Sequence, residues 1–414
     1  MTDGDRDLPT GVAHSTAHLP EAPGYWSYST LREIETCPRR YSLKHARYPD
    51  LWDKPGYPQI PHPAALFGDI VHDALERIIR ALTAAGCETS NSDSAVAVLR
   101  GIGGYTVAAK QSLAVQMLRL EGNPRIDDER RERLQQKLED RLAEARTEIQ
   151  GYLSRMLLMP NTRGTGDDAS SGGDGGSWER AARRPLGVGS HPEAVLQADR
   201  LRLRGRVDLL TVTRGRIDIV DHKTGVEDPN HLDQLRFYAL LWDQDEIANQ
   251  ARTRLGTLTA SYPMKQVTID APDDEALRSM VESTRSRVEA ADGHVLSDRP
   301  VALIGDHCGM CPVRSVCDEY WGSAVPAAAE VATGMWFDYE GVVGQQNGIK
   351  SWWLLDAARG TTELLLRTSR PGLQLKPGQR LRFLGLRRDE DPEVALIATL
   401  TADSEVFAVV QDGA

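Results

Sequence analysis

The chain has 414 residues and carries 49 Lys and Arg against 60 Asp and Glu, so its formal net charge at pH 7 is −11. This length suffices for two or more domains, and this charge excludes a protein that coats nucleic acid by bulk attraction while allowing a local basic strip. Five cysteines do not indicate a disulfide framework, and neither an apolar run of about 18 residues nor a signal pattern occurs, which predicts a soluble, cytoplasmic protein without membrane contact.

The first predicted elements lie near the N-terminus. Residues 1–22 are polar, with scattered Pro and Gly, and we expect them to be disordered. Residues 28–44 have helical spacing of apolar side chains, and either Ser29 or Thr30 can serve as the N-cap. We expect Pro38 to break or bend this helix, because proline lacks the N–H that continues the hydrogen-bond ladder.

Helices are also predicted for the next hundred residues. Residues 67–84 read as one helix that carries His72 and Glu76, and residues 92–158 read as long, charged helices. Such a helical insertion either lines a path for nucleic acid or packs on the rest of the domain. Residues 161–177 are mostly Gly, Ser, Thr and Asp and predict a flexible loop. The pattern G-x-x-x-x-G-K-[ST] is absent, so the sequence predicts no ATP-driven motor.

Strands follow this loop. Residues 193–200 begin one strand, and residues 201–213 and 216–221 are rich in Val, Ile and Leu on either side of the turn signal Arg214-Gly215. We therefore expect the last two segments to form an antiparallel hairpin. Arginines concentrate around it, as a basic strip for nucleic acid or as a solvated strand face: Arg200, Arg202, Arg204, Arg206, Arg214 and Arg216.

Two carboxylates and a lysine stand out in the hairpin. Asp208 lies within its first strand, and Asp221 ends its second strand, with Lys223 two positions later. Residues two apart in an extended segment point to the same side, so Asp221 and Lys223 can face one centre. Carboxylates bind hard cations such as Mg²⁺ or Mn²⁺, and we expect Lys223 to act there as a cation rather than as a general base.

A helix is predicted to begin near residues 230–231, with Gln234 and Tyr238 on one of its faces. The ordinary alternative for these two is a packed, hydrogen-bonded pair. A strand at 255–262 and a helix at 273–290 follow. This order predicts an α/β fold, with a mixed sheet flanked by helices.

The cysteines form a candidate metal site. The pattern C-x2-C-x5-C is made by Cys308, Cys311 and Cys317. Three thiolates this close can hold iron or zinc, and a complete site needs a fourth ligand, which Cys37 can supply. Zinc with His307 as a ligand is the competing interpretation. Cys87 has no apparent partner and is expected to be a small buried residue.

The C-terminal part has another pattern. Residues 323–332 look like a linker, and residues 333–414 contain about five short strands with Gly and Pro turns, which resembles the small all-β barrel of an OB-fold. Such barrels bind single strands with aromatic and basic side chains, and a structural or protein-binding barrel is an equal alternative. The candidates are Trp352, Trp353, Lys350, Arg367, Arg380 and Arg382. Alternation predicts that at least one of the adjacent tryptophans is in the core.

Four motifs carry a resemblance to a known family. G-R-V-D at 205–208, V-D-H-K-T-G at 220–225 and Q-L-R-F-Y at 234–238 resemble successive motifs of the RecB-like branch of the PD-(D/E)xK nucleases. G-D-I-V-H-D-A-L-E at 68–76 resembles the first helical motif of that branch. Each motif alone is weak, and their common order over about 170 residues makes the resemblance specific.

The resemblance implies a restriction-endonuclease-like core and a role for each motif residue. The ligands of Mg²⁺ or Mn²⁺ would be His72, Asp208, Asp221 and the backbone carbonyl of His222. Lys223 would position the attacking water, and Gln234 and Tyr238 would hold the site or the substrate strand. A glutamate near the metal in this family matches Glu193. Cys37 and the three later cysteines resemble the [4Fe–4S] ligands of AddB-type and CRISPR-associated members.

The resemblance further implies a metal-dependent deoxyribonuclease, acting as an exonuclease on single-stranded DNA ends in repair, recombination or antiphage defence. Because the chain lacks a motor, a separate helicase or defence subunit is an expected partner. Two alternatives stay open: a DNA-binding subunit that does not cleave, and a nuclease of CRISPR spacer acquisition. The complete set of site residues argues against the first alternative, and the barrel argues against the second.

Overall fold

The computed structural model describes residues 17–160, 183–357, 362–369, 373–391 and 393–409. The loop predicted at 161–177 lies outside these residues, as does most of the N-terminal segment predicted to be disordered. Of that segment the structure describes residues 17–22, where the backbones of His18 and Arg47 form an antiparallel bridge. No helix in the described part is both long and apolar enough to span a bilayer.

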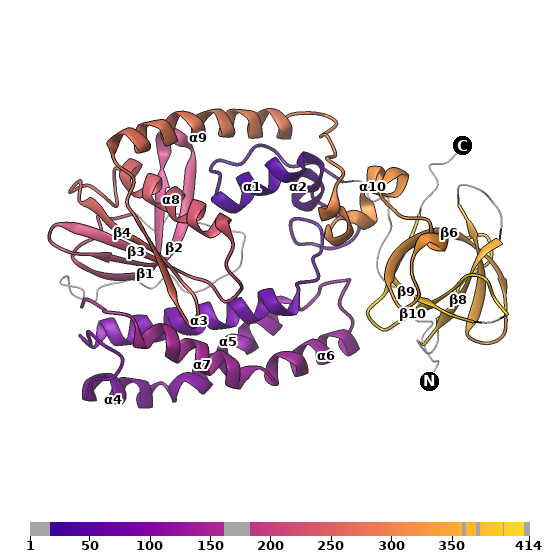
Figure 1. Cartoon of the computed structure of the whole chain (residues 1–414), viewed down its shortest axis with the longest axis horizontal. Helices are drawn as coiled ribbons and strands as arrows, with labels where there is room; N and C mark the ends of the chain where they lie inside the picture. The colour runs from indigo at the N-terminus through magenta and orange to yellow at the C-terminus, as the bar shows by residue number, and fades with distance from the viewer. Residues whose placement is uncertain (1–16, 161–182, 358–361, 370–372, 392, 410–414) are drawn as a thin grey trace.

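A five-stranded mixed sheet lies at the centre of the larger domain (Figure 1). Its strands, in their order of hydrogen bonding, are β1 (Gly189–Ala198), β2 (Leu203–Val212), β3 (Arg216–His222), β4 (Arg254–Ser261) and β5 (Gln266–Asp270). β2 and β3 form the predicted antiparallel hairpin. β3 and β4 are parallel, and α8 (Pro229–Gln244) makes the crossover that a parallel pair requires.

Helices cover both faces of this sheet. One face packs against α8, α1 (Tyr28–Thr36) and α9 (Asp274–Val295). The opposite face meets a helical layer through Leu209 and the half-buried Val220. This layer consists of α3 (Pro63–Ala84), which is the predicted helix with His72, and of the predicted insertion, which forms α4 (Asp93–Gly101), α5 (Gly104–Arg119), α6 (Asp128–Glu139) and α7 (Leu142–Ser154). Figure 1 shows α9 and these helices on opposite sides of the sheet.

The helix predicted at 28–44 is two helices, as its proline requires. α1 ends at Thr36, and α2 (Pro38–His45) begins with the proline at its first turn. Cys37 lies between them, and its sulfur accepts the Arg40 N–H at 3.4 Å. The N-cap of α1 is Ser27 and not Ser29 or Thr30, because the Ser27 hydroxyl accepts the Thr30 N–H.

The C-terminal strands close into a barrel. They are β6 (Trp336–Gln346), β7 (Ser351–Asp356), β8 (Thr362–Thr368), β9 (Arg380–Asp389), β10 (Ile397–Leu400) and β11 (Glu405–Ala408). β6, β7, β8, β10 and β9 pair in that order and β9 returns to β6, with only β8 and β10 parallel among these five. This closed five-stranded ring is consistent with an OB-like fold, and β11 adds to β9.

Buried arginines join the barrel to the larger domain. Arg125, between α5 and α6, donates to both carboxylate oxygens of Glu405 at 2.9 and 2.8 Å. Arg382 donates to the Ser315 carbonyl at 2.9 Å and to the Asp318 carboxylate at 2.9 Å. The segment between the two domains therefore contacts both. Its short elements are η2 (Asp306–Met310), η3 (Arg314–Val316), α10 (Asp318–Ser323) and η4 (Ala328–Glu330).

The mixed α/β core, the helical insertion and the small barrel confirm the predicted fold class. The segment 323–332, which was expected to be a linker, contains η4, and Ala328 of η4 packs into the barrel core.

Candidate active site

The register of the sheet places three carboxylates in one row. Residues of β1 and β2 pair so that Ala194 meets Val207 and Pro192 meets Leu209, which leaves Glu193 opposite Asp208. The pairing of Leu209 with Val220 continues the row to Asp221 on β3. Glu193 has φ of 54°, an uncommon backbone conformation for a residue with a side chain. The sequence contained Glu193 only as a family-based expectation, because this row depends on strand register.

A histidine from the helical layer completes the nearest group of ligand atoms. His72 on α3 places its Nδ1 3.5 Å from Asp208 Oδ1. In the described part of the chain, one set of at least three His, Cys, Asp or Glu residues has ligand atoms within 4.8 Å of one another, and it consists of His72, Glu193 and Asp208. The sequence predicted two of these three as metal ligands.

Asp221 belongs to a second group, with Lys223. The Lys223 ammonium is 2.6 Å from Asp221 Oδ2 and donates to Gln234 Oε1 at 2.8 Å. The Gln234 amide in turn donates to the Tyr238 hydroxyl at 2.7 Å. These four predicted residues therefore form one connected chain of polar contacts, in which the ammonium lies between Asp221 and Gln234.

Electrostatics separates these acids. Burial, with Asp208 as the next cause, raises the pKa of Asp221 to about 7. Burial also raises the pKa of Glu193 to about 8, again with Asp208 contributing. For Asp208 burial acts in the same direction, but the nearby His72 outweighs it and lowers the pKa. Burial opposes the charged form of His72, and the Asp208 carboxylate reverses this and raises its pKa to about 9.

The His222 backbone and ring have different surroundings. The backbone N–H of His222 donates to Asp208 Oδ2 at 2.6 Å, which orients that carboxylate. The ring lies 5.0 Å from the Tyr152 ring, centroid to centroid, and neither of its buried nitrogens has a hydrogen-bond partner. Burial lowers the pKa of His222 to about 4, so the ring is neutral at pH 7. The sequence did not single out Tyr152, whose hydroxyl donates to the Lys223 carbonyl at 2.8 Å.

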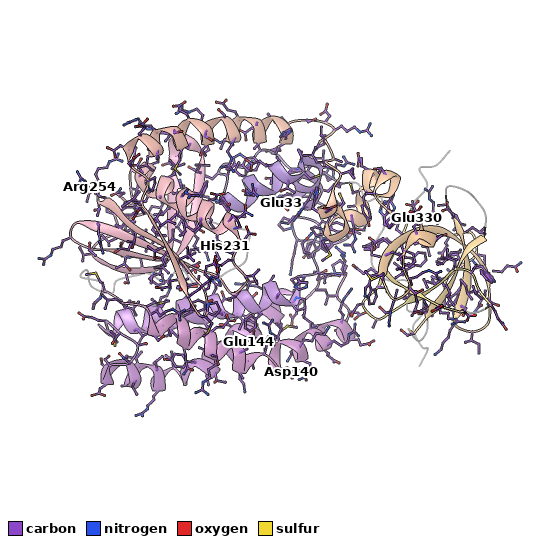
Figure 2. The ribbon with its side chains drawn as sticks, in the orientation of Figure 1. Glu33, Asp140, Glu144, His231, Arg254 and Glu330 are labelled. Atoms are coloured by element: carbon purple, nitrogen blue, oxygen red, sulfur yellow. The ribbon has the colours of Figure 1, made fainter. Side chains whose placement is uncertain are left out.

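Asp208, in the middle of β2, and Asp221, at the end of β3, line a cavity of about 510 Å³. His72 lies on its wall, and residues 223–228 and the first turns of α8 complete it. Figure 2 shows His231 at the start of α8, on the side of that helix nearest to α3. The cavity is lined with acids, an ammonium and amide groups, and it opens to solvent beside residues 225–228, which are exposed.

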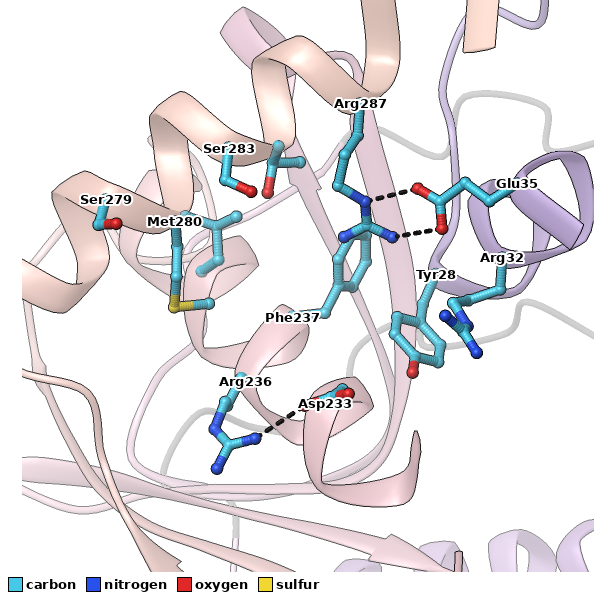
Figure 3. Close-up of a pocket in the computed structure, with 12 residues that line it drawn as sticks. Tyr28, Arg32, Glu35, Asp233, Arg236, Phe237, Ser279, Met280, Ser283 and Arg287 are labelled. Carbon is cyan, nitrogen blue, oxygen red and sulfur yellow. Dashed lines mark hydrogen bonds and ion pairs between the residues drawn. The ribbon is translucent and has the colours of Figure 1, made fainter. Parts of the chain in front are cut away.

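A second hollow lies on the opposite side of α8 (Figure 3). Its lining includes Arg236, which pairs with Asp233 at 2.8 Å, and Arg287, which pairs with Glu35 at 2.6 Å. Its charged lining consists of these two pairs and Arg32, so the hollow lacks the convergent acids and lysine of the first cavity. We therefore place the candidate active site on the first cavity.

The residues present fit a divalent metal ion. Carboxylate oxygens are the ligands that hard cations prefer, and an imidazole can join them. The raised pKa values of Asp221 and Glu193 show that burial and neighbouring negative charge disfavour their ionised forms. A cation bound between these carboxylates would stabilise their ionised forms.

The four cysteines proposed as a metal site lie in one region. The Leu303 N–H donates to Cys37 Sγ at 3.4 Å, and the Cys308 thiol contacts the Leu303 carbonyl at 3.9 Å. All four are buried and free, as is Cys87, which packs in the helical core as predicted. Burial raises the pKa of the Cys311 thiol and raises that of Cys317 to about 12. Within the described residues, no three cysteine sulfurs lie within 4.8 Å of one another.

The nucleic-acid candidates outside this cavity are in different situations. Trp352 is only 3% exposed and packs in the barrel core, so its interpretation as a base-stacking residue is wrong, while its neighbour Trp353 is half-buried. Arg382 is buried against Ser315 and Asp318, which excludes it too. Arg380 pairs with Glu340, and the exposed Arg206 lies 3.4 Å from Glu193, beside the carboxylate row.

Comparisons with known proteins add the following. No curated protein matches the chain. One matching solved structure is the OB domain of MM0293 from Methanosarcina mazei, at 16% identity over 20% of this chain and 79% of that chain, with a TM-score of 0.17. Another is the p204 HINb domain, at 12% identity over 28% of this chain and 56% of that chain, with a TM-score of 0.19. Both TM-scores are too low to support a fold assignment, so the barrel assignment depends on the strand pairing described above.

The family comparison covers the core. The model of the PD-(D/E)XK nuclease superfamily matches residues 25–318, well over half of the chain. The match contains the whole carboxylate row, His72 and Lys223, and nucleases of this superfamily use divalent metal ions to hydrolyse phosphodiester bonds. The chain belongs to the PD-(D/E)XK nuclease superfamily.

Proposed function

We propose that the protein is a Mg²⁺- or Mn²⁺-dependent deoxyribonuclease that acts as an exonuclease on single-stranded DNA ends. The observation that carries this proposal is one cavity lined by His72, Asp208, Asp221 and the Lys223 ammonium, with Glu193 beside Asp208 in the same row of carboxylates. The metal would be held by His72, Asp208 and Asp221, with Glu193 and the His222 carbonyl beside them. When bound, it supplies a Lewis acid that polarises the phosphate and activates water.

The protein's own residues have separate tasks in this proposal. Lys223 holds the attacking water and offsets negative charge on the phosphoryl oxygens. Gln234 fixes the position of the Lys223 ammonium, and Tyr238 fixes Gln234. The Tyr152 hydroxyl holds the Lys223 backbone from the helical side.

Lys223→Ala tests this proposal. Mutating one residue of such a connected catalytic group costs about 10²-fold or more in rate. We expect the variant to keep its circular dichroism spectrum and melting temperature, and to lose Mn²⁺-dependent release of nucleotides from end-labelled single-stranded DNA. Lys110→Ala, on the exposed face of α5, is the control and should retain activity. Undiminished cleavage by Lys223→Ala would falsify the assignment.

We further propose that Cys37, Cys308, Cys311 and Cys317 hold a [4Fe–4S] cluster. Their common location, burial and lack of disulfides support this. A single tetrahedral zinc with bonds of about 2.3 Å would bring its sulfurs to about 3.8 Å from one another. Among the described residues, no three of these cysteine sulfurs lie within 4.8 Å of one another. His307 favours zinc as the second candidate, because its buried Nε2 has no hydrogen-bond partner.

Metal analysis of anaerobically purified protein separates the two candidates. The cluster requires about four iron and four sulfide per chain and broad near-visible absorption that is lost in Cys37→Ser. One zinc per chain, with no iron, would contradict it. Dialysis of the same preparation against EDTA and then against Mn²⁺ measures whether the carboxylate site binds Mn²⁺.

The barrel and the cellular context complete the proposal. We propose that the barrel holds the single strand through its exposed basic residues, and that the protein acts in the cytoplasm with a separate helicase in repair or defence. Lys350 and Arg367 are both exposed on the barrel. Measuring the affinity of Lys350→Ala and Arg367→Ala for single-stranded DNA by filter binding tests whether the barrel binds the strand. Unchanged affinity would favour a structural barrel.

A further inference from the structure

Exposed apolar side chains stand at the mouth of the active-site cavity. Within the described part of the chain, the three most exposed large apolar residues are Met264 (90%), Val226 (88%) and Ile349 (88%). Ile349 lies in the turn between β6 and β7 of the barrel. Val226 lines the cavity itself, and Met264 lies in the adjoining turn. Covering these side chains with another apolar group would remove their surface from water, which is favourable.

Strand geometry brings these two residues to the same edge. β3 and β4 are parallel, and His222 pairs with Ser261 at their ends, so the segments that follow both leave there. The Lys223 N–H donates to the Ser261 carbonyl at 2.8 Å. Val226 follows the first strand, and Met264 lies in the turn from β4 to β5.

Side-chain contacts hold the two segments together. Glu227, next to Val226, pairs with Lys265, next to Met264. The Tyr262 hydroxyl and His231 Nδ1, on α8, are 2.8 Å apart. The two apolar tips are thus fixed to the sheet edge and to the helix that carries Gln234.

The charged groups beside the tips are already engaged. Glu227 and Lys265 pair with each other, and the Asp228 carboxylate accepts the Asn230 N–H at 2.8 Å as the N-cap of α8. Arg155 donates to the Tyr262 carbonyl at 2.7 Å. What Val226 and Met264 offer to an incoming strand is therefore apolar contact, which suits base faces better than phosphates.

We propose that Val226 and Met264 form a docking site for the terminal base pair of a DNA duplex and separate its strands, so that one strand enters the cavity. This inference rests on the proposed nuclease function and extends its substrates from single strands to duplex ends. Apolar side chains inserted at a base step unstack it at a cost of a few kcal/mol. Contact with Val226 and Met264 offsets that cost, and the strand directed to Lys223 needs no motor for its first nucleotides.

The test compares one sequence as a single strand and as a blunt duplex. In Met264→Ser, whose residue does not line the cavity, we expect cleavage of the single strand to stay within about twofold of the parent protein and cleavage of the duplex end to fall about tenfold, as loss of a wedge contact of about 1.4 kcal/mol requires. Val226→Ser/Met264→Ser should lower the ratio of duplex cleavage to single-strand cleavage further. Ile349→Ser is the matched control, because it removes an equally exposed apolar side chain from the barrel. It should change neither rate.

A binding measurement decides the inference independently of cleavage. In the Lys223→Ala background with Ca²⁺, a duplex carrying 2-aminopurine in its terminal base pair should become brighter on binding, and the double serine variant should abolish the increase. An equal loss of cleavage on both substrates, or no change of cleavage on either, would overturn the docking site. So would a duplex whose fluorescence does not increase when it binds, because its terminal base pair then stays closed. If the parent protein cleaves neither substrate, the proposed function fails, and the fluorescence experiment still decides the docking site.

Discussion

The acids of the cavity titrate in the range in which protons compete with metal ions. Asp221, Glu193 and His72 have pKa values raised to about 7, 8 and 9. A group binds a metal ion in its deprotonated form, and each of these is protonated below its pKa. Metal affinity must therefore rise from pH 6 to pH 9, because these ligands lose their protons over that range.

We expect the Mn²⁺ association constant of the metal-free protein to increase about tenfold per pH unit for each proton displaced. Calorimetric titration at pH 6, 7, 8 and 9 in buffers of different ionisation enthalpy measures both the affinity and the protons released. Glu193→Gln removes one titrating ligand and should reduce the slope. An affinity independent of pH would contradict the assigned ligands.

Glu148 on α7 gives a second prediction at this scale, for stability. Burial, with Glu144 contributing, raises its pKa to about 7, and its Oε2 is buried without a hydrogen-bond partner. The unfolded chain releases this proton near pH 4.5, so stability is lost as pH rises from there towards 7, and the native state bears the full cost above it. Glu148→Gln removes the ionisable group.

We expect Glu148→Gln to raise the free energy of unfolding by roughly 1 to 2 kcal/mol at pH 8 and to leave it unchanged at pH 4. Urea denaturation in the presence of EDTA at both pH values measures this. The control is Glu132→Gln, because this residue lies on the exposed face of α6. A stabilisation that is the same at pH 4 and pH 8 would exclude the protonation argument.

Residue-scale reasoning from the sequence reached part of this site. Asp221 and Lys223 could be placed on one side of a strand because alternation is local. Asp208 could be placed beside Asp221 only through the hairpin, and Glu193 only through the register of β1, which passes through a residue with φ of 54°. Alternation also showed that one of Trp352 and Trp353 faces inward, but not which, because the closure of the barrel decides it.

At the scale of elements, the approach of α8 to β2 positions the site. A Cβ on Gly205 would lie 2.7 Å from Leu241 Cδ1 and 3.1 Å from Tyr238 Cε1, closer than carbon atoms pack. Glycine at this position therefore lets the helix lie directly on the strand. Any displacement of α8 moves Tyr238 and Gln234, and with them the hydrogen bond to Lys223.

We expect Gly205→Ala to cost about 1 to 3 kcal/mol of stability, the usual range for overpacking, and to reduce cleavage beyond the fraction unfolded. Thermal melting and assays below the melting temperature separate the two effects. The control is Gly215→Ala in the turn between the same strands, where a Cβ meets no atom within 4 Å. Wild-type activity in Gly205→Ala would show that the helix tolerates the shift.

The elements with strong periodicity were predictable. Helices at 67–84 and 273–290 and the hairpin of β2 and β3 have repeated apolar positions, which report burial directly. β5 was not predicted, because its five residues provide too few repeats and two of its positions are half-buried while three are exposed. The N-cap of α1 was displaced by two or three residues, since Ser27, Ser29 and Thr30 can all cap and the packing of Trp26 selects the first.

At the scale of the whole molecule, the barrel docks through buried charge. Arg125 is almost fully buried between Tyr57 and Phe407, and both carboxylate oxygens of Glu405 accept its hydrogen bonds. Removing one partner of such a pair leaves the other without compensation in a medium of low polarity. No local pattern in the sequence indicated this contact, because its partners are 280 residues apart.

We expect Arg125→Met to cost about 3 to 5 kcal/mol, the range for breaking a buried pair, and to separate one calorimetric unfolding transition into two. Loss of the contact between the barrel and the larger domain should make the variant more susceptible than the parent protein to proteolysis near residues 323–332. Arg131→Met is the control, because the pair of Arg131 with Asp128 is exposed and such pairs contribute at most about 1 kcal/mol. A single unshifted transition would exclude an energetic role for the buried pair.

The position of the cysteine segment has a consequence for dissecting the protein. The Ser315 hydroxyl is hydrogen-bonded to Tyr57 of the core, and its carbonyl accepts from Arg382 of the barrel. Cutting the gene after residue 322 to produce a minimal enzyme would strip one wall from the sulfur-rich segment and expose the Arg314 and Arg125 guanidiniums that barrel carboxylates neutralise. A shortened version that proves inactive or colourless would therefore not identify the barrel as catalytic, since its removal dismantles the neighbouring architecture.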